Sequence, residues 1–300
     1  MSEKIGNVKL NYDFYSGVDT YSDGDIEDRL LEIVQSGADL DEVLTGSTEW
    51  AILYHLSPIR HNLLSWYDFG KDKSLLEIGS GCGAVTGIFC EKCGKVTSVD
   101  LSKRRSTINA WRNKDYDNLE IMVGNFEDIK FSEKYDYVSL IGVLEYSVYY
   151  LKSETPFLDM LKKAKSLLKP GGKLIIAIEN KYGIKYWAGA TEDHTGVPFD
   201  GITGYVGVNR VETFSRNSLK KLILDSGFKK TEFYYPVPDY KMPLEIYSED
   251  RLPGEDFMNG YTPAFDRDRY LFFDEGKAMN SLIKDGMFED FANSFLVICS

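Results

Sequence analysis

Three closely spaced glycines with an acidic residue on either side are the residues of this sequence best suited to binding chemistry. The segment Glu77-Ile78-Gly79-Ser80-Gly81-Cys82-Gly83, here called the glycine loop, follows a short apolar run and precedes a helical stretch. Glycines permit a tight turn with positive φ and let a ligand approach backbone N–H groups at the start of a helix. Asp100 ends the next apolar run, where a carboxylate commonly holds a ribose diol. The pattern predicts a nucleoside-binding loop.

Two classes of nucleoside cofactor compete for this loop. Gly79, Gly81 and Ala84 satisfy the dinucleotide pattern G-x-G-x-x-A. Glu77, however, lies two residues before the first glycine, where its charge would repel a diphosphate and attract a cationic amino-acid group. A third glycine at 83 instead of 84 also suits a loop that admits a bulkier group without phosphate. These residues favour S-adenosylmethionine.

Strands and helices are predicted to alternate around the glycine loop. Short apolar runs predict strands over 74–78, 95–100, 119–123, 135–142, 173–179, 231–237 and the last residues to Ser300. Helical spacing predicts helices over 84–93, 103–113, 155–168 and 215–226. Such alternation is typical of an α/β fold with a parallel, doubly wound sheet.

Residues 1–72 are predicted to be a helical N-terminal cap whose first twenty residues are irregular. Residues 73–300 are predicted to be the main domain. Two insertions rich in Gly, Pro and aromatic residues, about 180–214 and 236–268, interrupt the alternation. Long connections inside a compact domain are usually binding loops or lids.

Further motifs follow the glycine loop in a fixed order. They are Gly124-Asn125-Phe126, Tyr135-Asp136-Tyr137-Val138 leading into Val143-Leu144-Glu145, and Leu168-Lys169-Pro170-Gly171-Gly172. With the glycine loop and Asp100, they make residues 73–300 resemble the class I S-adenosylmethionine-dependent methyltransferases. Tyr146 departs from the family pattern, because many relatives have His at this place.

The resemblance implies a Rossmann-like, seven-stranded, doubly wound sheet whose last strand is antiparallel. It implies that Asp100 holds the ribose hydroxyls, that Leu101 lies against adenine and that Asn125 bonds the adenine amino group. A purely turn-forming role for Asn125 stays open. The complete implied cofactor-binding set is Glu77, Gly79, Ser80, Gly81, Gly83, Asp100, Leu101, Asn125, Phe126, Ile141 and Gly142.

The acceptor of the methyl group would meet residues of the two insertions. Methyl transfer needs alignment of the nucleophile, and an alcohol acceptor benefits from a nearby base. Glu192-Asp193-His194 lies between Gly189 and Gly196 and is expected to form an exposed, mobile loop. His194 is the candidate general base, with Asp193 or Glu192 orienting it or sharing the proton. The alternative is an ordinary surface histidine with acidic neighbours.

Three stretches, 55–64, 179–196 and 234–243, are unlike generic members of the fold. They resemble a bacterial methyltransferase subgroup found with, or fused to, glycosyltransferases of O-antigen and cell-surface polysaccharides. This resemblance implies O-methylation of a saccharide or another hydroxylated acceptor, and association with a glycosyltransferase. A small-molecule N- or O-methyltransferase unrelated to glycans and a non-catalytic cofactor-binding subunit stay open as alternatives. The sequence predicts no oligomeric state.

Charge and hydropathy limit the class of partner. The formal net charge is −12, without any run rich in Lys or Arg, which argues against a nucleic-acid binder. The longest apolar run, Leu174–Ile178, is far shorter than the roughly 20 residues of a membrane-spanning helix. The N-terminus lacks an apolar signal core, so a cytoplasmic protein is predicted.

Cysteine and histidine spacing predicts no metal site. Cys90 and Cys93 form a single C-x-x-C without a second ligand pair, so we expect buried free thiols. His55 and His61 lie six residues apart, and two further ligands are not evident near them.

Overall fold

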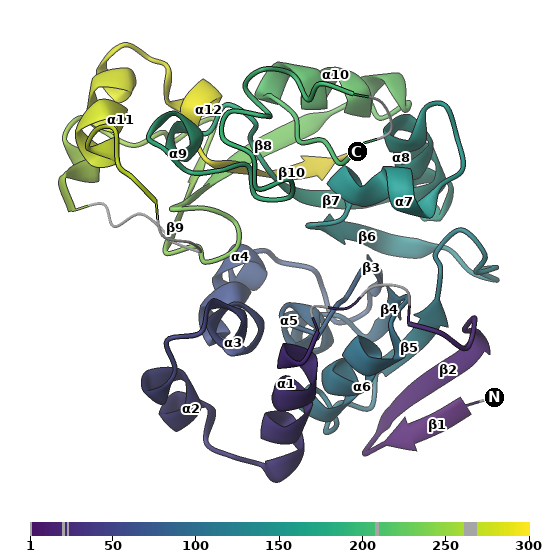
Figure 1. The fold of residues 1–300 in the computed structure, drawn as a ribbon. Coiled ribbons are helices and arrows are strands. Elements are labelled where there is room, and N and C mark those ends of the chain that lie inside the picture. Colours follow the sequence, from purple (N-terminus) through teal and green to yellow (C-terminus); the bar gives the residue numbers. More distant parts are fainter. Residues whose placement is uncertain (1, 20–21, 23, 208–209, 261–268) are drawn as a thin grey trace. The chain divides into compact units, whose positions relative to one another are not determined.

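The computed structural model describes residues 2–19, 22, 24–207, 210–260 and 269–300. The chain divides into two compact units, one of residues 1–140 and 167–173 and one of residues 141–166 and 174–300. Each unit contains strands and helices (Figure 1). The predicted division at residue 72 falls inside the first unit and stays a prediction.

The sheet of the first unit is parallel except for its first strand. Its strands, in spatial order, are β1 (Ser2–Ile5), β2 (Val8–Phe14), β5 (Leu119–Gly124), β4 (Lys95–Asp100), β3 (Ser74–Ile78) and β6 (Tyr135–Ile141). Pairing is parallel from β2 to β6, and β1 pairs antiparallel with β2. All five residues of β3 are buried, as expected for a central parallel strand. The α/β class predicted from the sequence is confirmed.

The prediction of an irregular N-terminus is wrong, because residues 2–14 form a hairpin that extends the sheet. Val8 and Leu10 are fully buried while Lys9 between them is exposed, the alternation of a half-buried strand. Gly6 and Asn7 connect the two strands, and Gly6 has a φ of 58°. A two-residue Gly-Asn connection between apolar runs is a hairpin signal that the sequence analysis overlooked.

The helices of the first unit are α1 (Ile26–Ser36), α2 (Leu40–Gly46), α3 (Trp50–Leu56), η1 (Pro58–His61), α4 (Asn62–Ser65), α5 (Thr86–Lys92) and α6 (Lys103–Arg112). Some of them share a buried cluster with the glycine loop. Leu30, Ile52 and Leu56 pack in one buried cluster with Cys82 of the glycine loop and Ile108 of α6. The N-terminal helices therefore support the loop directly. The cysteines at 90 and 93 are buried free thiols, as predicted.

The second unit is built on antiparallel pairs. Residues 174–179 of β7 (Leu168–Glu179) pair with β10 (Ser294–Cys299), which pairs with β8 (Thr231–Val237), and β8 pairs with β9 (Glu245–Ser248). The last strand is antiparallel to both neighbours, as the resemblance implied. All seven predicted strands are present, and β1, β2 and β9 are additional.

Short helices and irregular segments complete the second unit. They are η2 (Leu144–Tyr146), α7 (Ser147–Tyr150), α8 (Pro156–Ser166), α9 (Ile184–Trp187), α10 (Arg216–Asp225), η3 (Phe257–Gly260), α11 (Glu275–Lys284) and α12 (Phe288–Phe291). Residues 261–268 of the second predicted insertion lie outside the described residues. Among the helices described, none combines the length and apolar character needed to cross a bilayer.

Candidate active site

The glycine loop is fixed to the end of the neighbouring strand β4. The backbone N–H groups of Gly79 and Ser80 both donate to the carbonyl oxygen of Val99, at 2.8 and 3.0 Å. Asp100 accepts a hydrogen bond from the Gly81 N–H through Oδ2, at 2.8 Å, and one from the Ser102 N–H through Oδ1, at 2.9 Å. Asp100 thus joins the loop to the start of α6.

The glycines at 81 and 83 have different roles. A Cβ at Gly83 would lie 2.3 Å from Oδ1 and 3.0 Å from Cα of Asn109 on α6, so packing inside the protein requires this glycine. A Cβ at Gly81 would meet no atom within 4 Å, although its φ is +52°. Next to it, the Ser80 hydroxyl is buried without a hydrogen-bond partner. Open space and an unsatisfied hydroxyl fit a ligand bound on this loop.

Glu77 is a buried carboxylate supplied with hydrogen bonds. Its Oε2 accepts from the Thr86 hydroxyl at 2.7 Å and from the Ser98 hydroxyl at 2.6 Å. Burial raises the pKa of Glu77 to about 7 in spite of these hydrogen bonds. A cationic ligand group nearby would favour the ionised form, which is the interaction that the sequence predicts.

The remaining predicted cofactor residues fall in both units. Leu101 is half-buried, and Oδ1 of Asn125 accepts from the Glu127 backbone N–H at 3.0 Å, so Asn125 does form a turn. Phe126 is buried beside another phenylalanine ring. Ile141 and Gly142 belong to the second unit, and a Cβ at Gly142 would lie 2.9 Å from the Tyr240 hydroxyl oxygen.

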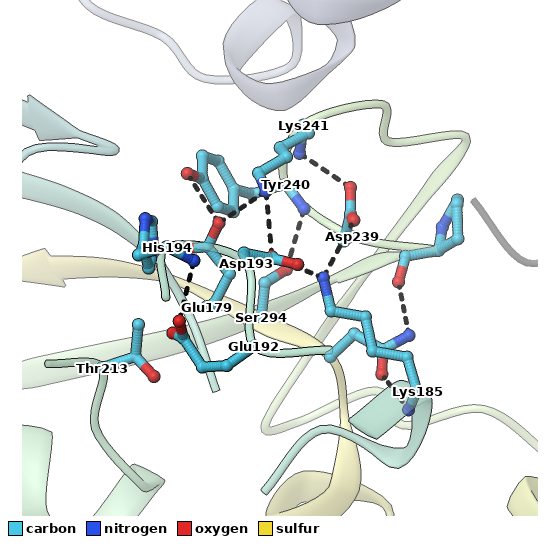
Figure 2. Close-up of polar contacts among 12 residues, drawn as sticks. Glu179, Lys185, Glu192, Asp193, His194, Thr213, Asp239, Tyr240, Lys241 and Ser294 are labelled. Atoms are coloured by element: carbon cyan, nitrogen blue, oxygen red, sulfur yellow. Dashed lines mark hydrogen bonds and ion pairs between the residues drawn. The ribbon is translucent and has the colours of Figure 1, made fainter. Parts of the chain in front are cut away.

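His194 is buried, so the expectation of an exposed loop is wrong. Only 6% of its side chain is exposed, and Glu192 is 2% exposed. Nδ1 of His194 lies 2.8 Å from the Tyr146 hydroxyl. Nε2 lies 3.4 Å from Oε2 of Glu179, and Figure 2 labels these two residues. Tyr146, the residue that departs from the family pattern, is therefore in contact with the histidine of the insertion.

The two acids beside His194 support its surroundings. Oδ2 of Asp193 accepts from Nζ of Lys185 at 2.7 Å and from Nζ of Lys241 at 2.9 Å. Oε2 of Glu192 accepts from the backbone N–H groups of His194 and Thr195, at 2.7 and 2.6 Å. Glu192 thereby holds the backbone on which the imidazole is carried.

Glu179 at the end of β7 is the carboxylate that faces the imidazole. Its Oε1 accepts from Nζ of Lys241 at 2.8 Å and from the Tyr240 hydroxyl at 3.3 Å. Burial would raise the pKa of Glu179, but the charges of Lys241 and His194 outweigh it and hold the pKa well below its usual range. Burial likewise lowers the pKa of His194, yet the charge and hydrogen bond of Glu179 raise it to about 9.

Glu145 in η2 completes this buried group. Its side chain is fully buried, and neither carboxylate oxygen has a hydrogen-bond partner. Burial, followed by the charge of Glu179, raises its pKa to about 8. One ligand atom each from Glu145, Glu179 and His194 lie within 4.8 Å of one another.

The residues around His194 come from separate segments, so their positions in the sequence do not show them as one site. Glu145 follows β6, Glu179 ends β7, and Tyr240 and Lys241 follow β8. A usable signal was present, since acidic residues at the carboxyl ends of strands in an α/β sheet commonly belong to sites.

Comparison with known proteins bears mainly on the part of the chain around the glycine loop. Residues 76–174 match the family model of a methyltransferase domain. This match confirms the predicted S-adenosylmethionine-dependent methyltransferase domain in that part of the chain. The match contains the whole glycine loop and extends into β7.

Curated relatives are similar over part of their length. The malonyl-(acyl-carrier protein) O-methyltransferase of Priestia megaterium is 27% identical over 118 residues, which are 39% of this chain and 40% of that protein. The ubiquinone biosynthesis O-methyltransferase of Hydrogenovibrio crunogenus is 23% identical over 138 residues, 45% of this chain and 54% of that protein. The chain thus spans about half the length of the curated relatives it matches.

Among solved structures, one similar protein is the N-methyltransferase NodS from Bradyrhizobium japonicum in complex with S-adenosyl-L-homocysteine. It is 23% identical, covers 51% of this chain and 76% of its own, and has a TM-score of 0.39.

Proposed function

We propose that this protein is an S-adenosylmethionine-dependent O-methyltransferase whose acceptor is a saccharide or another hydroxylated molecule of cell-surface glycan biosynthesis. The methyltransferase-domain match over residues 76–174 supports the reaction class. The observation that carries the cofactor assignment is the buried carboxylate of Glu77 beneath a loop that is open at Gly81. That carboxylate suits a cationic amino acid and disfavours a diphosphate.

The residues of the first unit have distinct roles in this proposal. Glu77 and the Ser80 hydroxyl face the amino-acid part, and Asp100 faces the ribose hydroxyls. The backbone of Gly81 allows the close approach. The proposed cofactor-binding set is Glu77, Gly79, Ser80, Gly81, Gly83, Asp100, Leu101, Asn125, Phe126, Ile141 and Gly142. S-adenosylmethionine, when bound, supplies a methyl group on a positively charged sulfur.

Methyl transfer to a hydroxyl would form a C–O bond and break the C–S bond with its electron pair left on sulfur, and the hydroxyl proton would pass to a base. We assign activation of the hydroxyl to His194, with Asp193 and Glu192 in support. Asp193 anchors Lys241, which in turn holds Glu179 against the imidazole, and Glu192 fixes the backbone at residues 194 and 195.

The resemblance of residues 179–196 to glycosyltransferase-associated methyltransferases supports the glycan acceptor and a glycosyltransferase partner. The net charge of −12 supports a partner other than nucleic acid. We place the protein in the cytoplasm on the same sequence features that predict it there.

A screen of acceptors tests the proposal. Free sugars, nucleotide sugars, oligosaccharides, catechols and amines are incubated with the protein and S-adenosylmethionine, and S-adenosylhomocysteine formation is measured. We expect turnover with a hydroxylated sugar class. Turnover with amines alone, or with no class while S-adenosylmethionine binds, would overturn the acceptor assignment.

A further inference from the structure

We infer that Glu145, Glu179 and His194 bind a divalent cation of the Mg²⁺ or Mn²⁺ type, which in turn holds hydroxyl oxygens of the acceptor. The cation site, meaning these three residues, lies wholly within the second unit. Only the role toward the acceptor rests on the proposed function. The inference departs from the sequence-based expectation that the protein holds no metal.

The three ligand atoms have the right spacing and chemistry. One oxygen of each glutamate and a ring nitrogen of His194 lie within 4.8 Å of one another. Ligands at about 2.0–2.3 Å from a common ion are separated by roughly 3–4.5 Å, so small adjustments would bring all three onto one cation. Two carboxylates with one imidazole suit a hard or borderline divalent ion.

Glu145 supplies an independent reason for a bound cation. Its carboxylate is fully buried in the cluster, and both of its oxygens lack a hydrogen-bond partner. A buried carboxylate without a partner is costly, and proteins normally satisfy such a group with donors, counter-charges or a metal. A bound cation would supply a partner for these oxygens.

The outer contacts orient the other two ligands. Nδ1 of His194 lies 2.8 Å from the Tyr146 hydroxyl, which allows Nδ1 to carry the proton and leaves Nε2 for the ion. Oε1 of Glu179 is held by Lys241 and Tyr240, which leaves Oε2 on the side of His194 (Figure 2). Metal-binding histidines and carboxylates are usually fixed by outer partners of this kind.

The neighbouring charges leave room for a divalent cation. Lys185 and Lys241 both pair with Asp193, at 2.7 and 2.9 Å, and Lys185 also lies 3.8 Å from Asp239. The two lysines are thus matched by two aspartates. Lys241 also contacts Glu179, but at Oε1, whereas the imidazole of His194 lies nearest Oε2. Glu145 and the Oε2 atom of Glu179 thus stay available to the ion.

Three protein ligands leave open positions on a six-coordinate ion. Two neighbouring hydroxyls of a sugar could occupy them, and a metal lowers the pKa of a bound hydroxyl. The activated oxygen would then attack the methyl carbon, with C–O formed and C–S broken. With the ion bound, His194 would activate the hydroxyl as a ligand of the ion in place of taking the proton directly, and the proton would pass to water.

Manganese binding tests the inference without cofactor or acceptor. The full chain is treated with EDTA, dialysed and titrated with MnCl₂, and free Mn²⁺ is measured by electron paramagnetic resonance. We expect one Mn²⁺ per chain and at least tenfold weaker binding in Glu145→Gln and His194→Gln. Glu77→Gln, which alters a buried glutamate of the first unit, should bind Mn²⁺ like the wild type.

Circular dichroism shows whether each variant is folded, and Glu145→Gln should fold because it removes an unpartnered buried charge. A wild-type protein that binds no Mn²⁺, or folded site variants that bind it equally well, would overturn the inference. Calorimetric titration of the EDTA-treated protein with S-adenosylmethionine separates the failure of the metal site from the failure of the proposed function. Binding of the cofactor without binding of Mn²⁺ would overturn only the metal site. Loss of S-adenosylhomocysteine formation on EDTA treatment and its return with Mn²⁺ or Mg²⁺ should accompany Mn²⁺ binding.

Discussion

The two units each bury a glutamate near the end of a strand, and the two glutamates have opposite surroundings. Glu77 receives hydrogen bonds from the hydroxyls of Thr86 and Ser98. Glu145 receives none on either oxygen. The protein thus supplies side-chain donors to the first carboxylate. For the second, burial and the charge of Glu179 raise the pKa in spite of the charges of His194 and Lys241.

This difference separates two uses of a buried charge. Glu77 is held in place ready to attract a cationic ligand group through space, as proposed for S-adenosylmethionine. Glu145 is placed for direct contact with a cation. Variants at the two regions should therefore affect cofactor affinity and metal affinity independently, because each reports on one unit.

The largest expected effect is that of His194→Ala on turnover. Loss of the imidazole removes the residue assigned to the acceptor hydroxyl, and we expect kcat to fall by about 10²–10³-fold. The dissociation constant of S-adenosylmethionine, measured by calorimetry, should stay within a factor of two. Turnover within threefold of the wild type would remove His194 from the mechanism.

Gly81→Ala should weaken S-adenosylmethionine binding about 10–100-fold, because the added methyl group occupies open space on the loop. Gly171→Ala is the matched control. Gly171 also has a positive φ, +77°, and open space around it, and it is exposed. Both variants should lose about 1 kcal/mol of stability through backbone strain. Equal cofactor affinity in the two would contradict the proposed place of the ligand.

Glu77→Gln should weaken cofactor binding about tenfold and at the same time stabilise the fold at pH 8. The folded protein raises the pKa of Glu77 from 4.5 to about 7, so it binds this proton more tightly than the unfolded chain does. The stabilisation of the folded state by the protonated Glu77 carboxyl is fully present below about pH 4.5 and is lost as the pH rises through 7. The glutamine should therefore add about 1–3 kcal/mol to the free energy of unfolding at pH 8.

Urea denaturation of the wild type and of Glu77→Gln at pH 4.5 and pH 8 checks whether the glutamine raises the free energy of unfolding only at the higher pH. The advantage of the glutamine variant should disappear at the lower pH. A variant that is less stable at pH 8 yet binds S-adenosylmethionine normally would show that Glu77 is a structural residue.

The smallest expected effect is a rise in thermal midpoint with metal. Millimolar Mn²⁺ should raise the midpoint of the wild type and of Glu77→Gln by a few degrees, since a ligand that binds only the folded state stabilises it. Glu145→Gln should show no rise. Equal rises in all three proteins would locate the metal elsewhere.

The glycine loop could be predicted as a binding site because the residues that indicate it lie close together in the sequence. Gly79, Gly81, Glu77 and Asp100 lie within one strand–loop–helix–strand unit, and hydrogen bonds within that unit hold them together. The main strands were predicted for a similar reason, since each is a short, continuous apolar run. The hairpin at 2–14 was missed because its strands are short and its turn signal is only two residues long.

The surroundings of His194 could not be predicted in the same way. Glycines on either side of residues 192–194 suggested an exposed loop, but tertiary contacts with Tyr146 and Glu179 bury it. Those partners are 48 and 15 residues distant in the chain. Only the fold brings them together, and no local pattern specifies such contacts.

Calorimetric titration of the full chain with S-adenosylmethionine, and separately with NAD, tests the central claim most directly. We expect saturable binding of S-adenosylmethionine at one site per chain, and no binding of NAD at the same concentrations. Binding of NAD, or a folded protein that gives no binding signal with S-adenosylmethionine, would contradict it.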